Sequence, residues 1–299
     1  MRSHQLNIKE IDEDTSWRET RQARDVRTDI KAKPFIKWVG GKTQLLPELI
    51  SRIPDDFSRY FEPFTGGGAL FFYLQSEQST LIDINEELTN AYTVIKYKTD
   101  ELIADLEQHI YKKDYYYQIR NVDRTDEYES WSDVRRASRL IYLNKTCFNG
   151  LYRVNSKGEF NTPIGRYKNP KIVDKTNLRA CSQALQKAEI INGSFLKVEE
   201  RVGSNDFVYF DPPYAPLNAT SNFTGYSSHG FDGEMQLSLR KLCDRLDKKG
   251  VRFMVSNSNA PLILDLYQNY RIELVYATRA INSKGNKRGK IPEVLVTNY

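Results

Sequence analysis

The segment 206–214 reads Asp-Phe-Val-Tyr-Phe-Asp-Pro-Pro-Tyr and ends in side chains that can hold an amino group. Its apolar, aromatic first half predicts a buried strand of a parallel sheet. Pro212 and Pro213 cannot pair in a ladder, so the strand must end there. Asp211 and Tyr214 then lie on a rigid turn at the carboxyl edge, where open α/β sheets bind ligands. The carboxylate and unpaired carbonyls can accept hydrogens of an exocyclic amine while the tyrosine stacks on its ring, although a proline-terminated strand with a capping aspartate looks the same.

A glycine-rich turn supplies a second element of a binding site. A predicted strand at 59–64 leads into Thr-Gly-Gly-Gly at 65–68, with Gly66 and Gly68, and then into an apolar helix. Strand, glycine turn and helix form the first unit of a nucleotide- or cofactor-binding sheet. The next predicted strand ends at Asp83, which is placed to accept hydrogen bonds from ribose hydroxyls. An N-cap for the following helix is the alternative role of this acid.

The segment 34–43 contains Gly-Gly-Lys-Thr, which invites comparison with a phosphate-binding loop. The Walker pattern requires a glycine where Ile36 stands, so that interpretation fails. The glycines still allow the backbone to approach a small ligand closely. Trp38 and Lys42 can then supply a flat ring and a cation, the latter suited to a carboxylate.

Residues 145–162 predict a β-hairpin, with Ser-Lys-Gly at 156–158 as its turn and Gly158 at the position that needs positive φ. Two-stranded ribbons fit the DNA major groove, and Arg153 is the natural guanine reader. Three following residues are candidates to hold phosphates: Arg166, Tyr167 and Lys168. An ordinary surface hairpin has the same pattern, so the motif needs its context.

The charge distribution supports a nucleic-acid surface in the middle of the chain. The net charge of +5 is too mild to indicate nucleic acid by itself. Residues 111–171, however, hold 13 Lys/Arg against 7 Asp/Glu, and 11 of the 36 aromatic residues. Basic residues interleaved with aromatic ones suit a surface that meets phosphates and bases. A solvated helical face is the alternative.

Several classes of protein are disfavoured. Cys147, Cys181 and Cys243 are far apart and none forms a CxxC pair, so neither a disulfide framework nor a zinc site is indicated. The three histidines have no ligand spacing, and we expect no metal. The chain has no apolar run near 18 residues, so we expect no membrane partner and a cytoplasmic location.

Four stretches resemble, in their order and spacing, the DNA adenine methyltransferase (Dam) family. They are Phe-Ile-Lys-Trp-Val-Gly-Gly-Lys at 35–42, Phe-Glu-Pro-Phe-Thr-Gly-Gly-Gly-Ala-Leu at 61–70, Leu-Ile-Asp-Ile-Asn at 81–85 and Asp-Pro-Pro-Tyr at 211–214. The segment from Cys147 to Tyr167 also looks like that family's DNA-recognition hairpin. Each motif alone is modest, but together they make chance resemblance very unlikely.

The resemblance covers about residues 34–299 and implies an α/β fold. It implies a Rossmann-like S-adenosylmethionine-dependent methyltransferase sheet, formed by residues 34–92 and 188–299. A mainly helical DNA-recognition domain that carries the β-hairpin is expected to be inserted at 93–187. Residues 1–33 lie outside the resemblance as a polar N-terminal extension.

The resemblance also implies the activity, which is methyl transfer from S-adenosylmethionine to N6 of adenine in double-stranded DNA. The family's usual target is GATC, and the target base must be flipped out of the duplex. No metal is required. A restriction endonuclease of the same specificity is a possible functional partner, and a solitary role is the alternative.

Residue roles follow from the matching motif positions. The expected catalytic residues are Asp211, Pro212 and Tyr214. The expected donor-binding residues are Trp38, Lys42, Gly66, Gly68, Asp83 and Asp211. Lys37 and Arg153 are expected to contact guanines, Leu151 and Pro163 to contact target bases, and Phe148 and Asn149 to fill the gap left by the flipped adenine. The expected phosphate contacts remain Arg166, Tyr167 and Lys168.

Other functions share parts of this pattern. A cytosine N4 methyltransferase more often has serine where Asp211 stands, and the hairpin argues against a protein amide methyltransferase. A catalytically silent DNA-binding module would need neither Asp211 and Tyr214 nor Asp83 and the glycine turn. Adenine methylation is therefore the function that the sequence favours.

Overall fold

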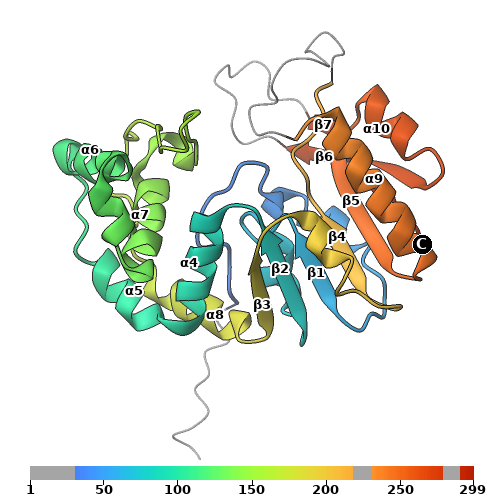
Figure 1. The fold of residues 1–299 in the computed structure, drawn as a ribbon, viewed down its shortest axis with the longest axis horizontal. Coiled ribbons are helices and arrows are strands. Elements are labelled where there is room, and N and C mark those ends of the chain that lie inside the picture. The colour runs from blue at the N-terminus through green and yellow to red at the C-terminus, as the bar shows by residue number, and fades with distance from the viewer. Residues whose placement is uncertain (1–30, 218–230, 279–289) are drawn as a thin grey trace, which may run out of the picture. The chain divides into compact units, whose positions relative to one another are not determined.

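The computed structural model describes residues 31–217, 231–278 and 290–299 (Figure 1). The predicted N-terminal extension, residues 1–33, therefore lies outside the described residues except at its end. There, Ala32 is buried, and the backbone of Lys33 exchanges two hydrogen bonds with the side chain of Asn177. The last residues of the predicted extension thus pack onto the folded part of the chain.

A seven-stranded sheet in the order β3-β2-β1-β4-β5-β7-β6 organises the described residues (Figure 1). The strands are β1 Tyr60–Pro63, β2 Ser79–Asp83, β3 Ala188–Asn192, β4 Phe207–Phe210, β5 Arg252–Ser258, β6 Arg271–Thr278 and β7 Lys290–Thr297. Strands β1 to β5 are parallel, and β7 runs antiparallel between β5 and β6. The predicted α/β class is confirmed. The strand order reverses between β1 and β4, and ligands of open α/β sheets bind outside such a switch point.

Helices connect the strands and cover the sheet. The α-helices are α2 Leu46–Ile50, α3 Ala69–Leu74, α4 Glu86–Tyr97, α5 Thr99–Leu106, α6 Lys113–Asn121, α7 Asp133–Thr146, α8 Lys175–Leu185, α9 Gly233–Lys248 and α10 Pro261–Leu266. The 3-10 helices are η1 Lys42–Gln44, η2 Val122–Arg124, η3 Asp126–Ser130, η4 Phe148–Gly150 and η5 Phe195–Val198. Within the described ranges, no helix has the length and apolar character needed to span a membrane.

Strand side chains alternate between two hydrophobic cores, as the two-residue period of a strand requires. One core, which includes residues of α3, α4 and α8, receives Tyr60, Leu81, Phe207, Tyr209 and Met254. The other, which includes residues of α9 and α10, receives Phe61, Ile82, Val208, Phe210, Phe253 and Val255. The sheet is therefore covered on both faces, and its functional groups must lie at the strand ends.

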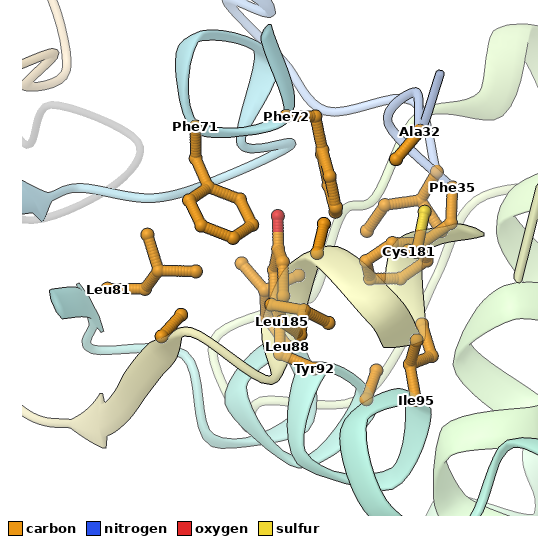
Figure 2. Close-up of a cluster of buried hydrophobic side chains, with 14 of the residues drawn as sticks. Ala32, Phe35, Phe71, Phe72, Leu81, Leu88, Tyr92, Ile95, Cys181 and Leu185 are labelled. Carbon is orange, nitrogen blue, oxygen red and sulfur yellow. The ribbon is translucent and has the colours of Figure 1, made fainter. Parts of the chain in front are cut away.

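The first core also holds the segment that precedes Trp38 (Figure 2). Phe35 packs edge-to-face on Tyr92 of α4, with 4.9 Å between ring centroids. Cys181 of α8 donates through its thiol to the carbonyl of Lys33. This packing anchors the chain two to five residues before Lys37 and Trp38, which enter the site described below.

The sequence pattern is helical from Asn85 to about Tyr117, and this expectation is confirmed. The structure divides the segment into three helices, α4, α5 and α6. Lys98 leaves the helical conformation with φ −133° and ψ 38°, and Thr99 starts α5. The proposed boundary between residues 92 and 93 falls inside α4. The domain boundaries themselves stay a prediction.

Candidate active site and nucleic-acid interface

The glycine turn predicted at 65–68 lies between β1 and α3, at the carboxyl edge of the sheet. Gly66 and Gly68 have φ of +49° and +63°, a conformation that residues with a side chain rarely adopt. A Cβ on Gly66 would lie 2.8 Å from Cδ1 of Trp38, and one on Gly68 would lie 2.7 Å from the hydroxyl of Tyr92. Both backbone conformation and space therefore require glycine here, and the turn packs directly against the Trp38 ring.

Asp83 ends β2 beside this turn. Its Oδ2 accepts from the Gly66 amide at 2.9 Å, and its Oδ1 accepts from the Asn85 amide at 2.9 Å. The N-cap of α4 is Asn85, whose side chain accepts from Leu88, so the capping alternative for Asp83 is wrong. Burial raises the pKa of the Asp83 carboxyl, and the amides of Asn85 and Gly66 oppose that rise. Each carboxylate oxygen keeps a second lone pair for a ligand hydroxyl.

Asp211 follows β4, which lies next to β1 in the sheet, so it is at the same carboxyl edge as the glycine turn. Its Oδ1 accepts from Ser256 Oγ at 2.8 Å and forms an ion pair with Lys42 Nζ at 2.6 Å. Lys42 also donates to the Gly40 carbonyl at 2.6 Å, and its side chain is only 8% exposed. The cation that the sequence suggests for a ligand carboxylate thus contacts the carboxylate of Asp211 in this structure.

Tyr214 is held by a residue of β7, the strand that runs antiparallel to β5. Its hydroxyl donates to Oε2 of Glu293 on β7 at 2.8 Å, and Lys42 Nζ lies 4.7 Å from its ring centroid. Burial, followed by the charge of Asp211, raises the pKa of Tyr214 well above its usual value. The ring therefore stays neutral and is fixed in orientation next to Asp211.

Glu62 is a second carboxyl group beneath this edge. It is 3% exposed, and its Oε2 accepts from the Tyr60 hydroxyl at 2.8 Å and from the Phe71 amide at 3.0 Å. Burial raises the pKa of Glu62 to about 8, the Tyr60 hydrogen bond opposes the rise, and the charge of Asp211 adds to it. Glu62 is therefore mainly protonated at neutral pH.

The predicted donor-binding residues meet at one edge of the sheet. Trp38 packs on the glycine turn, this turn bonds to Asp83, and Lys42 bonds to Asp211. The free lone pairs of Asp83 can accept hydrogen bonds from ribose hydroxyls. The Trp38 ring and the close backbone approach at the glycine turn suit the flat base of a nucleoside. The residues present therefore fit an S-adenosyl donor.

The hairpin predicted at residues 145–162 is paired between residues 147 and 164 in the structure. Its ladder consists of two antiparallel bridges, Cys147 with Ile164 and Val154 with Phe160. Gly158 has φ +81° and lies in open space, as the turn prediction requires. The predicted hairpin is therefore confirmed as a chain reversal at Gly158 with sparse antiparallel pairing.

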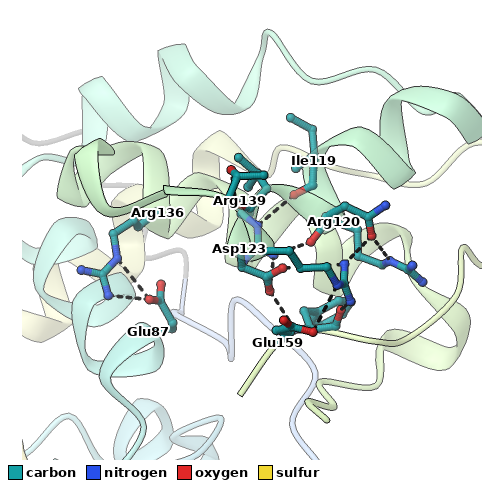
Figure 3. Close-up of polar contacts among 12 residues, drawn as sticks. Glu87, Ile119, Arg120, Asp123, Arg136, Arg139 and Glu159 are labelled. Carbon is teal, nitrogen blue, oxygen red and sulfur yellow. Dashed lines mark hydrogen bonds and ion pairs between the residues drawn. The ribbon is translucent and has the colours of Figure 1, made fainter. Parts of the chain in front are cut away.

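A buried ion pair anchors the hairpin to the helices (Figure 3). Arg139 of α7 bonds Asp123 Oδ2 at 2.7 Å, and the two side chains are 6% and 9% exposed. The same carboxylate accepts from the Phe160 amide at 2.7 Å. Arg124 donates to the Phe160 carbonyl at 3.0 Å and bonds Glu159 at 3.2 Å. The returning arm of the hairpin is thus held by a network that the sequence did not indicate.

The other arm of the hairpin contacts the start of the folded chain. The buried amide of Asn144 accepts from the Lys37 amide at 2.9 Å, and it donates to the carbonyls of Lys37 and Gly150 at 2.7 and 3.0 Å. The Trp38 ring stacks on Tyr152, with centroids 5.0 Å apart and planes 21° apart. These contacts join the hairpin to the sheet edge that holds the predicted donor-binding residues.

Most of the predicted DNA contacts are exposed. The exposed ones are Lys37, Phe148, Asn149, Arg153, Pro163, Arg166 and Lys168. Leu151 is partly buried, and so is Tyr167, whose hydroxyl donates to the Cys147 carbonyl at 3.0 Å. Asn149 has φ +58°, and Phe148 is 51% exposed. An exposed aromatic ring and amide at a tight turn can enter a base stack, whereas Tyr167 already holds the hairpin.

Five residues outside the predicted site support the Asp211 turn, defined as residues 211–215. They are Gln236, Ser256, Asn257, Ser258 and Glu293. Three of them belong to Ser-Asn-Ser at 256–258, a polar stretch at the end of β5. The sequence did carry one signal for them, namely polar residues that continue an apolar strand toward the carboxyl edge of the sheet.

Comparison with known proteins agrees with this geometry. A sequence model of the family described as D12 class N6 adenine-specific DNA methyltransferase matches residues 38–281. The type II methyltransferase M1.LlaDCHI of Lactococcus lactis subsp. cremoris is 46% identical over 277 residues, covering 91% of this chain and 98% of that protein. The type II methyltransferase M.MjaIII of Methanocaldococcus jannaschii is 43% identical over 290 residues, covering 90% and 100%.

A third relative carries the name suggested by the sequence motifs. The DNA adenine methylase of Escherichia coli is 34% identical over 270 residues, covering 89% of this chain and 95% of that protein. The family match extends from Trp38 through the glycine turn, the hairpin and the Asp211 turn. The chain therefore belongs to the D12 class of N6 adenine-specific DNA methyltransferases.

Proposed function

We propose that this enzyme methylates N6 of adenine in GATC sites of double-stranded DNA, after flipping the adenine out of the duplex. The observation that supports this most is the state of Asp211. Its Oδ1 is engaged by Lys42 and Ser256, whereas Oδ2 has no hydrogen-bond partner among the described residues. A fixed carboxylate with one open oxygen is suited to accept a hydrogen from an amine.

The Asp211 turn provides the amine-binding groups. Asp211 Oδ2 and the Pro212 carbonyl accept the two N6 hydrogens, and Tyr214 stacks on the flipped ring. Within the described ranges the Pro212 carbonyl makes no other hydrogen bond, whereas the Pro213 and Ala215 carbonyls are already engaged. Accepting both hydrogens favours tetrahedral geometry at N6 and frees its lone pair for methylation.

Six residues are proposed to hold the donor: Trp38, Lys42, Gly66, Gly68, Asp83 and Asp211. S-adenosylmethionine supplies a methyl group that is already activated by its bond to a sulfonium. The protein therefore contributes mainly positioning and exclusion of water. A metal is not needed in this scheme, because the protein has only to bind and orient a neutral amine.

No general base is assigned. After methylation, N6 carries one proton in excess, and this acidic proton is lost to water. Asp211 and Pro212 hold the amine before that loss and do not have to remove a proton during methyl transfer. Activity should therefore not depend on the titration of a histidine.

The hairpin is proposed to read GATC. Lys37 and Arg153 contact guanines, since a long cationic side chain matches O6 and N7 of guanine in the major groove. Leu151 and Pro163 contact the target bases, and Phe148 with Asn149 fills the gap left by the flipped adenine. Arg166 and Lys168 are proposed phosphate contacts, with Tyr167 supporting them.

We further propose that the enzyme works in the cytoplasm beside a restriction endonuclease of the same specificity. The type II names of two relatives support this pairing. Expression of the enzyme should then protect DNA from an endonuclease that cuts unmethylated GATC. Continued cutting of fully modified DNA would contradict the pairing.

The test of the function is tritium transfer from labelled S-adenosylmethionine to two duplexes that differ in a single GATC. Label on adenine N6 in the GATC duplex alone would support reaction, donor and target together. Label in both duplexes would keep the chemistry and reject GATC. Label in neither, with DNA binding intact, would reject the proposed activity.

A further inference from the structure

We infer that Ser256 is a positioning residue, which together with Tyr209 fixes the orientation of the Asp211 carboxylate. This inference rests on the proposed function, because it concerns the group that is proposed to bind the target amine. Ser256 lies on β5, and its side chain is fully buried. Neither residue is part of the matched motif that contains Asp211.

The direction of the hydrogen bonds follows from the chemistry of the three groups. An ionised carboxylate only accepts, so the single Ser256 hydroxyl hydrogen points to Asp211 Oδ1 at 2.8 Å. The carbonyl of Phe210 is a poorer acceptor at 3.4 Å. The Tyr209 hydroxyl lies 3.0 Å from Ser256 Oγ and must therefore donate to it. Tyr209, Ser256 and Asp211 form a chain of donors that ends on one carboxylate oxygen.

The positions of these groups are set by the sheet. β4 and β5 pair in parallel with Phe210 opposite Val255, and Ser256 also lies opposite Leu295 of β7. Ser256 thus comes directly after the last residue that pairs with β4 and is itself paired with β7, so its backbone cannot shift without disturbing the β5–β7 ladder. Tyr209 is 1% exposed, and burial raises the pKa of its hydroxyl well above the usual value, so it remains a donor.

The residues around Ser256 hold the rest of the Asp211 turn. Asn257 Oδ1 accepts from the Ala215 amide at 3.0 Å, and Ser258 donates to the Ala215 carbonyl. Gln236 of α9 donates to the Pro213 carbonyl at 2.9 Å and accepts from Asn257 at 3.1 Å. These bonds fix the backbone of the turn, whereas Ser256 acts on the side chain of Asp211.

The consequence concerns rotation of the carboxylate. Lys42 is the other donor to Oδ1, but it also bonds the Gly40 carbonyl and reaches Asp211 through a flexible four-carbon chain. Ser256 has a short side chain on a rigid strand, so it sets the plane of the carboxylate more strictly. Removing its hydroxyl leaves Oδ2 less well aimed at the amine without removing any group that contacts DNA or donor.

The test compares Ser256→Ala, Ser256→Thr and Tyr209→Phe with the wild-type enzyme. The matched control is Ser138→Ala, which deletes an equally buried hydroxyl that bonds His109 in the helical region. Single-turnover N6 methylation of a GATC duplex is measured with saturating S-adenosylmethionine. Dissociation constants for donor and duplex, and the melting temperature, are measured for each variant.

We expect Ser256→Ala to lower the single-turnover rate roughly tenfold to a hundredfold, the range for one hydrogen bond to a charged group. Both dissociation constants should stay within about twofold, because the contacting groups remain. Ser256→Thr should keep most of the rate, Tyr209→Phe should lose several-fold, and Ser138→Ala should match wild type. Tyr209→Phe still tests the inference if Ser256→Ala does not fold.

A wild-type rate in Ser256→Ala, or in Tyr209→Phe if only that variant folds, would overturn the inference. It would also be overturned if the rate falls only in proportion to weakened donor or duplex binding, because that pattern indicates a general structural role. Absence of N6 methylation in the wild-type enzyme would instead reject the proposed function. The two failures are therefore distinguishable.

Discussion

The Asp211 turn and the hairpin carry different parts of the proposed function and are built differently. The turn lies on a sheet edge, where buried Ser256, Asn257 and Gln236 bond its backbone and its carboxylate. The ladder of the hairpin consists of two antiparallel bridges, and most of its predicted DNA contacts are exposed. The returning arm of the hairpin is anchored by the buried pair of Asp123 and Arg139.

The difference matches the two tasks. Methyl transfer depends on a near-attack geometry, in which small misplacement is costly, so its groups are held by many buried bonds. Base recognition requires side chains that can reach a groove, so most of the predicted DNA contacts remain exposed. In this structure the Arg153 guanidinium donates to Asn161 Oδ1 at 2.6 Å. Stability and specificity should therefore respond differently to substitutions in the two regions.

The largest effect is expected at the Asp211 turn itself. Asp211→Ala should reduce methyl transfer by roughly a thousandfold, about 4 kcal/mol, because the proposed acceptor for the amine is lost. Binding of a GATC duplex should remain measurable by fluorescence anisotropy. Asp265→Ala, an exposed aspartate on α10, is the matched control and should keep full activity. Methylation that persists in Asp211→Ala would place the amine-binding site elsewhere.

The anchor of the hairpin comes next. Asp123→Ala leaves the buried Arg139 without its partner, which should lower the free energy of unfolding by about 3–5 kcal/mol. It also frees the Phe160 amide, so discrimination between GATC and altered sites should weaken. Urea unfolding and methylation of both duplexes provide the two measurements.

The control for this change is Asp100→Ala. Asp100 pairs with Arg179 on the surface, with side chains 82% and 60% exposed. Exposed pairs contribute about 0–1 kcal/mol, so this variant should remain close to wild type. Equal losses of unfolding free energy in Asp123→Ala and Asp100→Ala would show that burial does not increase the contribution of the Asp123–Arg139 pair to stability.

A more selective effect is expected at Arg153. Arg153→Ala should relax discrimination at one guanine by roughly 1–3 kcal/mol, because the proposed bidentate base contact would be lost. The measurement is kcat/KM on GATC and on duplexes with each base pair replaced in turn. Lys168→Ala, a proposed phosphate contact, should instead weaken all duplexes alike and reduce the salt slope by about one. Uniform weakening in Arg153→Ala would identify it as a phosphate contact.

The last prediction concerns the pH dependence of stability. The folded protein holds the proton of Glu62 up to a pKa of about 8, whereas the unfolded chain releases it near 4.5. Stability should therefore fall as pH rises between these values, by at most roughly 1.4 kcal/mol per pH unit. Glu62→Gln should flatten that fall, measured by urea unfolding at each pH, and exposed Glu189→Gln should not. An unchanged slope in Glu62→Gln would mean that Glu62 is ionised in the folded state.

The sequence alone determined the parts whose signals are local. Prolines after an apolar run placed Asp211 and Tyr214 at a strand end, and the glycine run placed the turn before α3. The acid at the end of β2 was also predictable, since the pattern of a strand ends at Asp83. Gly158 marked the chain reversal of the hairpin, because a tight turn that needs positive φ favours glycine independently of the rest of the fold.

The tertiary structure decided which of these groups touch one another. Ser256 lies 45 residues after Asp211, and they meet because β4 and β5 are neighbours in the sheet. Asp123 and Phe160 are 37 residues apart and meet because the hairpin packs against η2. A local pattern carries no information about such pairs, because a hydrogen bond between distant segments depends on the register and packing of the whole fold. The candidate site residues could therefore be predicted from motifs, whereas the groups that orient them could be seen only in the folded protein.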